Sequence, residues 1–243
     1  MAIVVKMSGK QKDAMSTFTN EVDILKGLRH PGICSLLHSG AMDDRPWIAL
    51  EHMAGGSLHS LLHSEHNEHN LESALLSRIV AQVASGLSYL HESGVIHRDL
   101  KTANVLLDAA LHAKLCDFGL STRFGRAEYS AERGTYRQMA PEILLRKPYD
   151  HRIDVYSYGI LLWETLHCKE PFAGMLPLQA AFAVAMQEAR PQMDLREEHQ
   201  PYAELICACW DGEPTNRPEM NRLAEAAAAL LAAVSGEQVM EIQ

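Results

Sequence analysis

The sequence predicts an α+β fold in which a small sheet comes first and helices follow. In the first fifty residues the apolar side chains form short, β-branched runs, whereas beyond Gly55 and Gly56 they recur at helical spacing. The chain has 243 residues, 47% of them hydrophobic, which is enough for a buried core without disulfide bonds. We therefore expect two lobes, residues 1–54 with the sheet and residues 55–243 with most of the helices.

The first lobe is expected to contain three strands and one helix. Residues 2–7 favour a strand because they hold three consecutive β-branched residues in a run too short for a helix. A stripe at helical spacing follows, formed by Met15, Phe18, Val22 and Leu25. The proline and glycine at 31–32 end this helix. Two more strands are predicted at 33–37 and 47–52, joined by a turn at 43–46.

The second lobe is expected to be mainly helical. Ser57 can cap a short helix that runs through residues 61–62. A long amphipathic helix that ends at Gly94 is indicated by Leu76, Ile79, Val83, Leu87 and Leu90. Short strands and turns are expected over 95–116, then an irregular polar stretch up to Ala140, and helices from there to the end.

Composition argues against several classes of function. The net charge of −9 disfavours nonspecific binding to nucleic acid or to an anionic membrane. The longest apolar stretch, residues 226–234, is shorter than the roughly 20 residues that span a bilayer. Five cysteines without a CxxC pair suggest neither a disulfide framework nor a four-cysteine zinc site. We expect a cytoplasmic protein that binds no nucleic acid and does not insert into membranes.

Three motifs carry the functional interpretation: HRDLKTAN at 97–104, DFG at 117–119 and APE at 140–142. In this order and at this spacing they resemble the eukaryotic protein kinases, and GTYRQMAPE and DVYSYGILLWE resemble the tyrosine-kinase-like branch of the serine/threonine kinases. The resemblance implies a two-lobed protein-kinase-like fold with a truncated N-terminal β lobe. It also implies transfer of the γ-phosphoryl group of ATP, with Mg²⁺, to serine or threonine hydroxyls of protein substrates.

The same resemblance assigns the nucleotide-binding residues. Lys6 matches the lysine that holds the α and β phosphates, and Glu21 matches the glutamate that pairs with it. Val4, on the same strand face as Lys6, is expected above the adenine, and Leu106 below it. Leu50 is the expected gatekeeper. The backbone of the hinge segment that follows it, Glu51, His52 and Met53, is expected to bind adenine.

The catalytic residues follow from the first two motifs. Asp99 matches the aspartate that accepts the proton of the substrate hydroxyl. Asn104 and Asp117 match the two magnesium ligands, and their oxygen donors are the type that Mg²⁺ prefers. Lys101 resembles the lysine that serine/threonine kinases direct at the γ-phosphate, and Thr135 matches the threonine that contacts this pair.

The resemblance also extends to residues that support the catalytic loop. Glu142 and Arg217 match a buried ion pair, and Asp154 matches the aspartate that holds the catalytic loop from below. Gln138 replaces the tryptophan usual in this branch. The hydrophobic spine of the active state is matched by Leu25, Leu36, His97 and Phe118.

The sequence departs from the family pattern at its beginning, where no GxGxxGxV loop precedes Lys6. Hydrogen bonds from such a loop to phosphates contribute about 1.5–3 kcal/mol each, so we expect weak ATP binding. We also expect residues 3–7 to form an exposed sheet edge and residues 1–50 to be loosely held. The alternative to an active kinase is therefore a kinase-like binding scaffold with weak or no turnover.

The segment after DFG is expected to be a phosphorylation switch. Arg98 resembles the arginine that pairs with a phosphorylated residue there, and a phosphate adds about −1.5 to −2 charge. Ser130 is the first expected acceptor and Thr122 the second, for an upstream regulatory kinase. The arginines expected to assist are Arg123, Arg126 and Arg133.

A histidine tract leaves two further interpretations open. Its members, spaced by 4, 3 and 3 residues, are His59, His63, His66 and His69. Such spacing can place imidazoles on one helical face and bind Zn²⁺ or Ni²⁺. The other interpretation is a solvated helix end and polar loop, which the absence of an HExxH motif favours.

Overall fold

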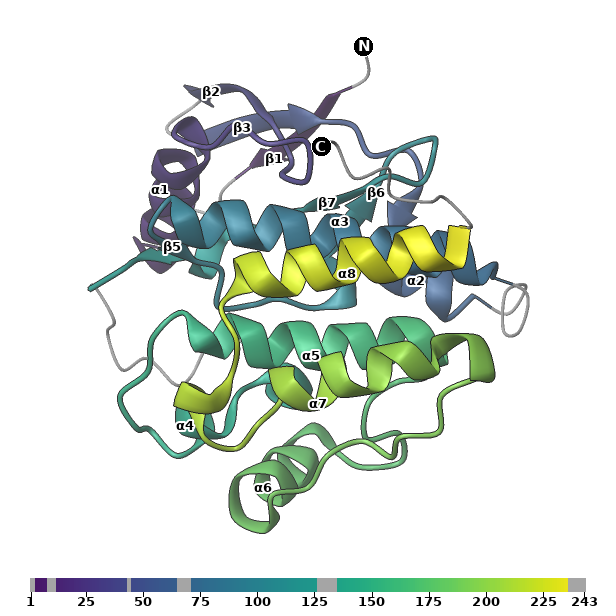
Figure 1. The fold of residues 1–243 in the computed structure, drawn as a ribbon. Coiled ribbons are helices and arrows are strands. Elements are labelled where there is room, and N and C mark those ends of the chain that lie inside the picture. The colour runs from purple at the N-terminus through teal and green to yellow at the C-terminus, as the bar shows by residue number, and fades with distance from the viewer. Residues whose placement is uncertain (1–2, 8–11, 43–44, 65–70, 126–134, 236–243) are drawn as a thin grey trace.

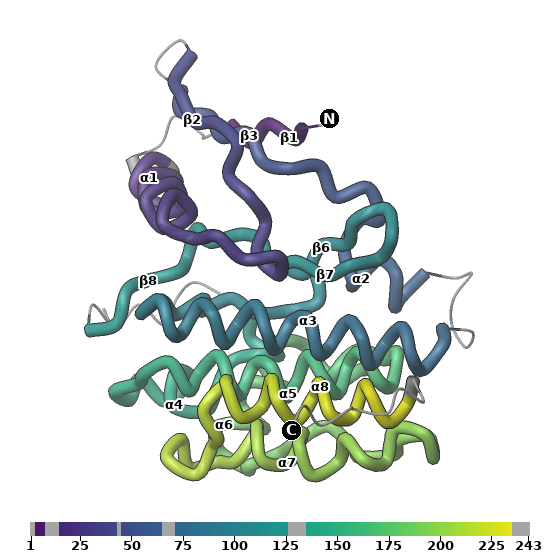
Figure 2. Tube along the Cα trace, turned by 45° about the horizontal axis from the view of Figure 1, so that its top comes forward, coloured from purple at the N-terminus to yellow at the C-terminus, as the bar shows by residue number. Residues whose placement is uncertain are grey.

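The computed structural model describes residues 3–7, 12–42, 45–64, 71–125 and 135–235 and confirms the two-lobed α+β fold. In Figures 1 and 2 three strands and one helix lie on one side of the longest helix, α3, and the remaining large helices lie on the other. The chain passes from the sheet lobe to the helical lobe after β3, near residues 52–55.

The sheet lobe holds a three-stranded antiparallel sheet in the order β1-β3-β2. Its elements are β1 (Ile3–Met7), α1 (Lys12–Lys26), β2 (Leu36–Met42) and β3 (Arg45–Glu51). Helix α1 packs on the sheet through Phe18 and Val22, which contact Ile48 in a small buried cluster. In the described part of the chain, β1 pairs on one side only, so the expected edge strand is confirmed, and its apolar side chains are about half exposed.

The strand expected at 33–37 begins later than the sequence indicated. Ile33 forms a parallel bridge to Leu115, and the Cys34 amide donates to the Leu115 carbonyl at 2.9 Å. Ile33 and Cys34 are buried, so they tie the two lobes together and the strand starts only at Leu36. Residues 45–46, expected in a turn, instead begin β3 because they pair with the end of β2.

The helical lobe contains most of the remaining elements. Its helices are α2 (Leu58–Leu62), α3 (Ser73–Glu92), α4 (Pro141–Leu144), α5 (Arg152–His167), α6 (Pro177–Gln187), α7 (Ala203–Cys209) and α8 (Met220–Ser235). Its short strands are β4 (Gly56–Ser57), β5 (Val95–Ile96), β6 (Val105–Leu107), β7 (Ala113–Leu115) and β8 (Thr122–Arg123). Single 3₁₀ turns are η1 (Thr102–Asn104), η2 (Phe118–Leu120), η3 (Tyr136–Gln138), η4 (Glu197–Tyr202) and η5 (Pro214–Asn216).

Two expected helix boundaries are confirmed with their local causes. Ser57 caps α2, because its hydroxyl accepts a hydrogen bond from the Ser60 amide at 3.1 Å. Helix α3 ends just before Gly94, which has a φ of +70° that a glycine adopts without strain. Both boundaries place loops that carry residues of the site described below.

The main hydrophobic core surrounds α5. This helix is buried on nearly all sides, and it lies next to α3, which packs along α8 (Figure 1). The largest fully buried side chains of α5 are Tyr156 and Tyr158. The loops that carry the predicted motifs therefore rest on the best-buried part of the chain. None of the described helices has both the length and the apolar character needed to cross a membrane.

Candidate active site

The loop 97–104 places its charged residues in one hydrogen-bonded group. The Asp99 carboxylate accepts hydrogen bonds from Lys101 Nζ at 2.8 Å, Asn104 Nδ2 at 2.9 Å and Thr135 Oγ1 at 3.2 Å. Lys101 Nζ also donates to Thr135 Oγ1 at 2.8 Å. The structure thus brings Asp99, Lys101, Asn104 and Thr135 together, and it fixes the Asp99 carboxylate on three sides.

Asp154 on α5 holds this loop from beneath. Its carboxylate accepts hydrogen bonds from the backbone amides of His97 at 2.7 Å and Arg98 at 2.9 Å. Arg98 has a φ of +69°, a conformation that costs a non-glycine residue energy and that these bonds help to maintain. Burial would raise the pKa of Asp154, but the hydrogen bond and charge of His91, with smaller contributions from His97, hold it below its usual value. Asp154 therefore anchors the loop as a carboxylate.

Lys6, Glu21 and Asp117 form a second charged group. Lys6 Nζ lies 2.9 Å from Glu21 Oε2 and 3.0 Å from Asp117 Oδ1. The three side chains come from β1, α1 and the start of η2, so the contact joins the sheet lobe to the DFG segment. Asn20, the neighbour of Glu21, adds a hydrogen bond from Nδ2 to the Ser121 carbonyl at 2.7 Å.

The pKa values in this group follow from unequal burial. Glu21 is only 1% exposed, and burial raises its pKa although Lys6 partly opposes the shift. Burial also acts on the pKa of Lys6, in the lowering direction, but Glu21 and Asp117 outweigh it and the pKa is raised. The pKa of Asp117 is lowered because Lys6, helped by His97 and Lys101, outweighs the effect of burial. Lys6 is therefore firmly charged.

An apolar patch lies where the sequence predicts the adenine site. Met53 is buried against Cys34 and Cys116, and Leu50 and Leu106 pack on this cluster. The motifs in the sequence gave no indication that these two buried cysteines lie in this cluster. The structure thus gathers Leu50, Met53 and Leu106 around one apolar surface.

Val4 and Glu51, two more of the residues expected near adenine, differ in how they are held. Val4 pairs with Leu50 across β1 and β3 and is 45% exposed. The Glu51 amide donates to the Ser35 carbonyl at 3.1 Å, and the Glu51 carboxylate accepts from Lys114 Nζ at 2.7 Å. The backbone amide of Glu51 is thus already used within the protein. Of its two backbone groups, the carbonyl is therefore the candidate for a hydrogen bond to adenine.

Three residues of the expected spine, Leu25, His97 and Phe118, are buried, and Leu36 is partly buried. The rings of His97 and Phe118 are in contact at a centroid distance of 5.2 Å with their planes tilted by 55°, and neither residue is more than 1% exposed. Leu25 and Phe118 belong to the main core, and Leu36 packs against it from β2. The main core thus includes residues from the sheet lobe and from the DFG segment, and Phe118 contacts His97 at the start of the loop 97–104.

Comparison with known proteins identifies the family. Residues 1–226 match the family model described as protein tyrosine and serine/threonine kinase. The chain belongs to the protein kinase family. It is 37% identical over 91% of its length to the serine/threonine-protein kinase STY46 of Arabidopsis thaliana. It is 39% identical over 85% of its length to the serine/threonine/tyrosine-protein kinase HT1 of the same plant, and 35% identical over 93% to the dual specificity protein kinase shkC of Dictyostelium discoideum.

The chain spans 38%, 53% and 46% of the lengths of these three relatives, so it corresponds to one part of them. That part is the kinase domain, because the match to the family model covers nearly the whole chain. The family expected from the HRDLKTAN, DFG and APE motifs is thereby confirmed.

The donor atoms of this kinase domain fit a nucleotide with magnesium. Asn104 turns its Nδ2 end toward Asp99, so its amide oxygen lies at the other end of the group. The Asp117 side chain is half exposed and negatively charged, with its pKa lowered chiefly by Lys6 against the effect of burial. An amide oxygen and a carboxylate are suitable Mg²⁺ ligands, and Lys6 adds a cation for phosphate oxygens.

The expected phosphorylation switch lies mostly outside the described residues. Ser130 falls there, as do Arg126 and Arg133. Thr122 is described, and it pairs with Ile96 between β8 and β5. The Arg98 guanidinium lies 5.8 Å from the ring centre of Tyr149.

Glu142 and Arg217 form the expected buried ion pair of the kinase domain. Arg217 Nη1 and Nη2 donate to the two carboxylate oxygens of Glu142 at 2.6 Å and 2.9 Å. Gln138, which replaces a tryptophan of the family pattern, is 9% exposed. Its backbone carbonyl accepts a hydrogen bond from Ser157 Oγ at 2.8 Å, so this turn stays fixed to α5.

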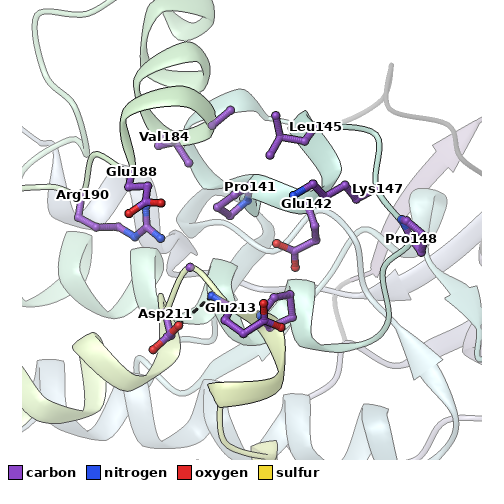
Figure 3. Close-up of a pocket in the computed structure, with 13 residues that line it drawn as sticks. Pro141, Glu142, Leu145, Lys147, Pro148, Val184, Glu188, Arg190, Asp211 and Glu213 are labelled. Carbon is purple, nitrogen blue, oxygen red and sulfur yellow. Dashed lines mark hydrogen bonds between the residues drawn. The ribbon is translucent and has the colours of Figure 1, made fainter.

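A cavity of about 650 Å³ lies beside this ion pair, between α4, the end of α6 and the loop at 211–214. Figure 3 shows Glu142, Arg190 and Glu213 around it. The cavity is lined by no residue of the Asp99 group or the Lys6 group, so it is separate from the predicted nucleotide site.

Several contacts of the site carry no sequence signal. Lys114 binds Glu51 from 63 residues away, and His91 binds Asp154 at 3.0 Å. Glu164 on α5 contacts His63 of the histidine tract. In a single sequence nothing pairs these residues; the position of His91 four residues after Leu87 is a signal that it faces inward, but it does not point to Asp154.

Proposed function

We propose that this chain is the catalytic domain of a protein serine/threonine kinase that transfers the γ-phosphoryl group of Mg·ATP to protein hydroxyls. The observation that carries the proposal is the hydrogen-bonded group of Asp99, Lys101 and Thr135. It places a carboxylate, a cation and the Thr135 hydroxyl within one network. Such a network suits proton acceptance from a hydroxyl beside a developing phosphate charge.

Lys6 is proposed to bind the α and β phosphates, and Glu21 to position Lys6. The proposal is supported by the 2.9 Å contact of Glu21 with Lys6 and by the deep burial of the Glu21 carboxylate. Because Glu21 is part of α1 and its side chain is buried, it limits the directions in which the Lys6 ammonium can point. Val4 and Leu106 are proposed to enclose the adenine from its two sides.

The adenine edge is proposed to meet the hinge after the gatekeeper Leu50. The Glu51 carbonyl and the Met53 amide are the proposed partners, supported by the engagement of the Glu51 amide with Ser35. Asn104 and Asp117 are the proposed ligands of Mg²⁺. When bound, the metal would neutralise charge on the transferred phosphoryl group.

Serine and threonine are the proposed acceptors. This choice is supported by Lys101, which sits two residues after Asp99 and bonds both Asp99 and Thr135. The names of relatives that match the chain include serine/threonine-protein kinases, although one is named a dual specificity kinase. Proteins are the proposed substrates, and an upstream kinase acting on the segment after DFG is the proposed regulator.

A kinase-like binding scaffold is the second candidate function. It is favoured by β1, whose apolar side chains are about half exposed and which pairs on one side only within the described residues. A loosely held β1 would fix Lys6 and Val4 poorly and would weaken ATP binding.

The proposed boundary between the lobes remains at residues 54 and 55. The proposed location is the cytoplasm, supported by five cysteines that are all unpaired.

The test measures phosphoryl transfer from Mg·ATP to a generic protein acceptor, with analysis of which amino acid is labelled. Asp99→Asn is expected to lower the rate by about 10²–10⁴-fold while Mg·ATP binding is kept. Asp23→Asn, on an exposed position of α1, is the matched control and should leave the rate unchanged. Equal rates for Asp99→Asn and the unaltered chain would refute the proposal, and a folded chain that transfers no phosphoryl group would favour the scaffold instead.

A further inference from the structure

Three side chains of metal-binding type meet beside α2, outside the proposed kinase machinery. His59 and His63 come from α2 and its end, and Glu164 comes from α5. The ligand atoms that these three residues offer all lie within 4.8 Å of one another. His63 Nε2 is 2.9 Å from Glu164 Oε1.

The two histidines are held at fixed spacing by the backbone. The His63 amide donates to the His59 carbonyl at 3.0 Å, which closes one helical turn between them. Leu58 and Leu62 are almost fully buried and anchor this turn to the core. The imidazole rings lie 4.6 Å apart between centroids. Two imidazoles four residues apart on a helix are a common arrangement for chelating one metal ion.

Glu164 provides an independent sign that a cation belongs here. The residue is 1% exposed, and its Oε1 atom accepts hydrogen bonds from Thr102 Oγ1 at 2.8 Å and faces His63. Its Oε2 atom is buried without a hydrogen-bond partner among the described residues. A buried carboxylate oxygen without a partner is costly, and a bound cation would satisfy it.

The cluster also has room for a metal ion and its remaining ligands. A cavity of about 250 Å³ is lined by His59, Thr102 and Glu164, and it continues to Lys101 and Thr135. A cavity of this size has room for several water molecules, and Lys101, Thr102 and Glu164 offer them polar partners. An ion at the cluster would thus keep one side open toward the cavity.

We infer that His59, His63 and Glu164 form a Zn²⁺ site with its fourth position open to this cavity. Two imidazoles and one carboxylate are a known three-ligand set for zinc with an open position, whereas Mg²⁺ and Ca²⁺ prefer oxygen ligands alone. Tetrahedral zinc bonded at about 2.0–2.2 Å holds its ligand atoms about 3.3 Å apart. Binding therefore closes the widest separation, at most 4.8 Å, by up to about 1.5 Å, and slightly lengthens the 2.9 Å contact between His63 Nε2 and Glu164 Oε1.

The site does not depend on kinase activity, and its test is a binding measurement. The metal-free chain is titrated with Zn²⁺ at pH 8 in competition with a chromophoric chelator, because the imidazoles must be deprotonated to bind. One equivalent of Zn²⁺ is expected to bind. Glu164→Gln and His59→Ala should each weaken affinity at least about tenfold, whereas His38→Ala, at an exposed position on β2, should not.

A double variant distinguishes this cluster from the rest of the tract. His66 and His69 lie outside the described residues, and H66N/H69N removes both imidazoles. Affinity equal to that of the unaltered chain supports the proposed site. The proposal would be overturned if only H66N/H69N lost affinity for Zn²⁺, or if Glu164→Gln and His59→Ala bound Zn²⁺ as tightly as the unaltered chain does. Failure of the unaltered chain to compete with the chelator would also overturn it.

Cobalt gives a readout of the ligand geometry. Co²⁺ bound to the chain should show the intense visible absorption of tetrahedral nitrogen and oxygen coordination, and His59→Ala should abolish it. Circular dichroism checks that each variant folds. If Glu164→Gln unfolds, His59→Ala decides the question, because its partly exposed side chain is not needed for the core.

Discussion

The two halves of the proposed active site rest on supports of opposite kind. Lys6 lies on the edge strand β1, whose apolar side chains are about half exposed. Asp99 instead lies on a loop that is hydrogen-bonded to the fully buried Asp154. Regions with few buried contacts open more easily than those with many. We therefore expect the loop that carries Asp99 to keep its geometry more firmly than β1, which carries Lys6.

The ion pairs of the two lobes differ in the same way. Glu142 and Arg217 are both buried and bidentate, whereas Lys6 is 44% exposed beside the buried Glu21. Removing one partner of a buried pair leaves an uncompensated charge, but removing an exposed cation does so only in part. We therefore expect the first pair to contribute mainly to stability and the second mainly to the proposed binding of phosphates.

The largest effect is expected from Arg217→Ala. It leaves Glu142 buried without its partner, so the free energy of unfolding should fall by about 3–5 kcal/mol. Denaturant titration followed by circular dichroism measures this change. Arg152→Ala, which breaks more exposed pairs with Asp150 and Glu219, is the control and should cost about 1 kcal/mol or less. Equal losses in the two variants would remove the distinction.

Lys6→Met is expected to separate function from stability. Phosphoryl transfer should fall by about 10²–10³-fold, because a fixed cation beside the phosphates is lost. The unfolding free energy should fall by less than in Arg217→Ala, because the Glu21 carboxyl that loses its partner already has a raised pKa and can take up a proton. Steady-state kinetics and denaturant titration test the two halves, with the exposed Lys26→Met as control. A large loss of stability would show that β1 supports the fold itself.

Hydrogen exchange tests the difference between the lobes directly. Amides of β1 should exchange at least about a hundred times faster than those in the middle of α3 and α5, because exchange follows local opening. Mass spectrometry of peptides from these elements measures it. Equal protection would mean that the sheet lobe is as well held as the helical core.

Much of this architecture could be predicted from the sequence. Strand 2–7, the helix around Phe18 and the long helix ending at Gly94 follow from β-branched runs and helical spacing, and all three are observed. The motif at 97–104 likewise placed Asp99, Lys101 and Asn104 in one loop. Short-range rules suffice when the cause of a structure lies within a few residues.

The parts that could not be predicted depend on distant partners. Ile33 looks like the start of a strand, but its place is set by Leu115, which is 82 residues away. The histidine tract indicated imidazoles, yet nothing near it pointed to Glu164. Such contacts follow from how the helices pack, and a single sequence does not reveal that packing.

The smallest effect is a difference in titration within the Lys6 group. The pKa of Glu21 should lie above its ordinary value of 4.5, because burial outweighs Lys6, and that of Asp117 should lie below 3.8, because Lys6 outweighs burial. Ionised Glu21 thus costs stability near neutral pH, and this cost disappears as the pH falls through its raised pKa. Asp117 contributes stability above its unfolded pKa, and that contribution is lost only when the pH falls through its lower folded pKa.

Near pH 4 the protein should therefore hold a neutral Glu21 and a charged Asp117, with Lys6 paired to Asp117 alone. Carbon-13 NMR of the two carboxyl groups measures both midpoints. Asp117→Asn should shift the Glu21 midpoint downward, because the like charge of Asp117 contributes to raising it. A Glu21 midpoint below 4.5 in the unaltered chain would show that Lys6 dominates burial, and the contrast between the exposed and buried ion pairs would then be smaller than the structure indicates.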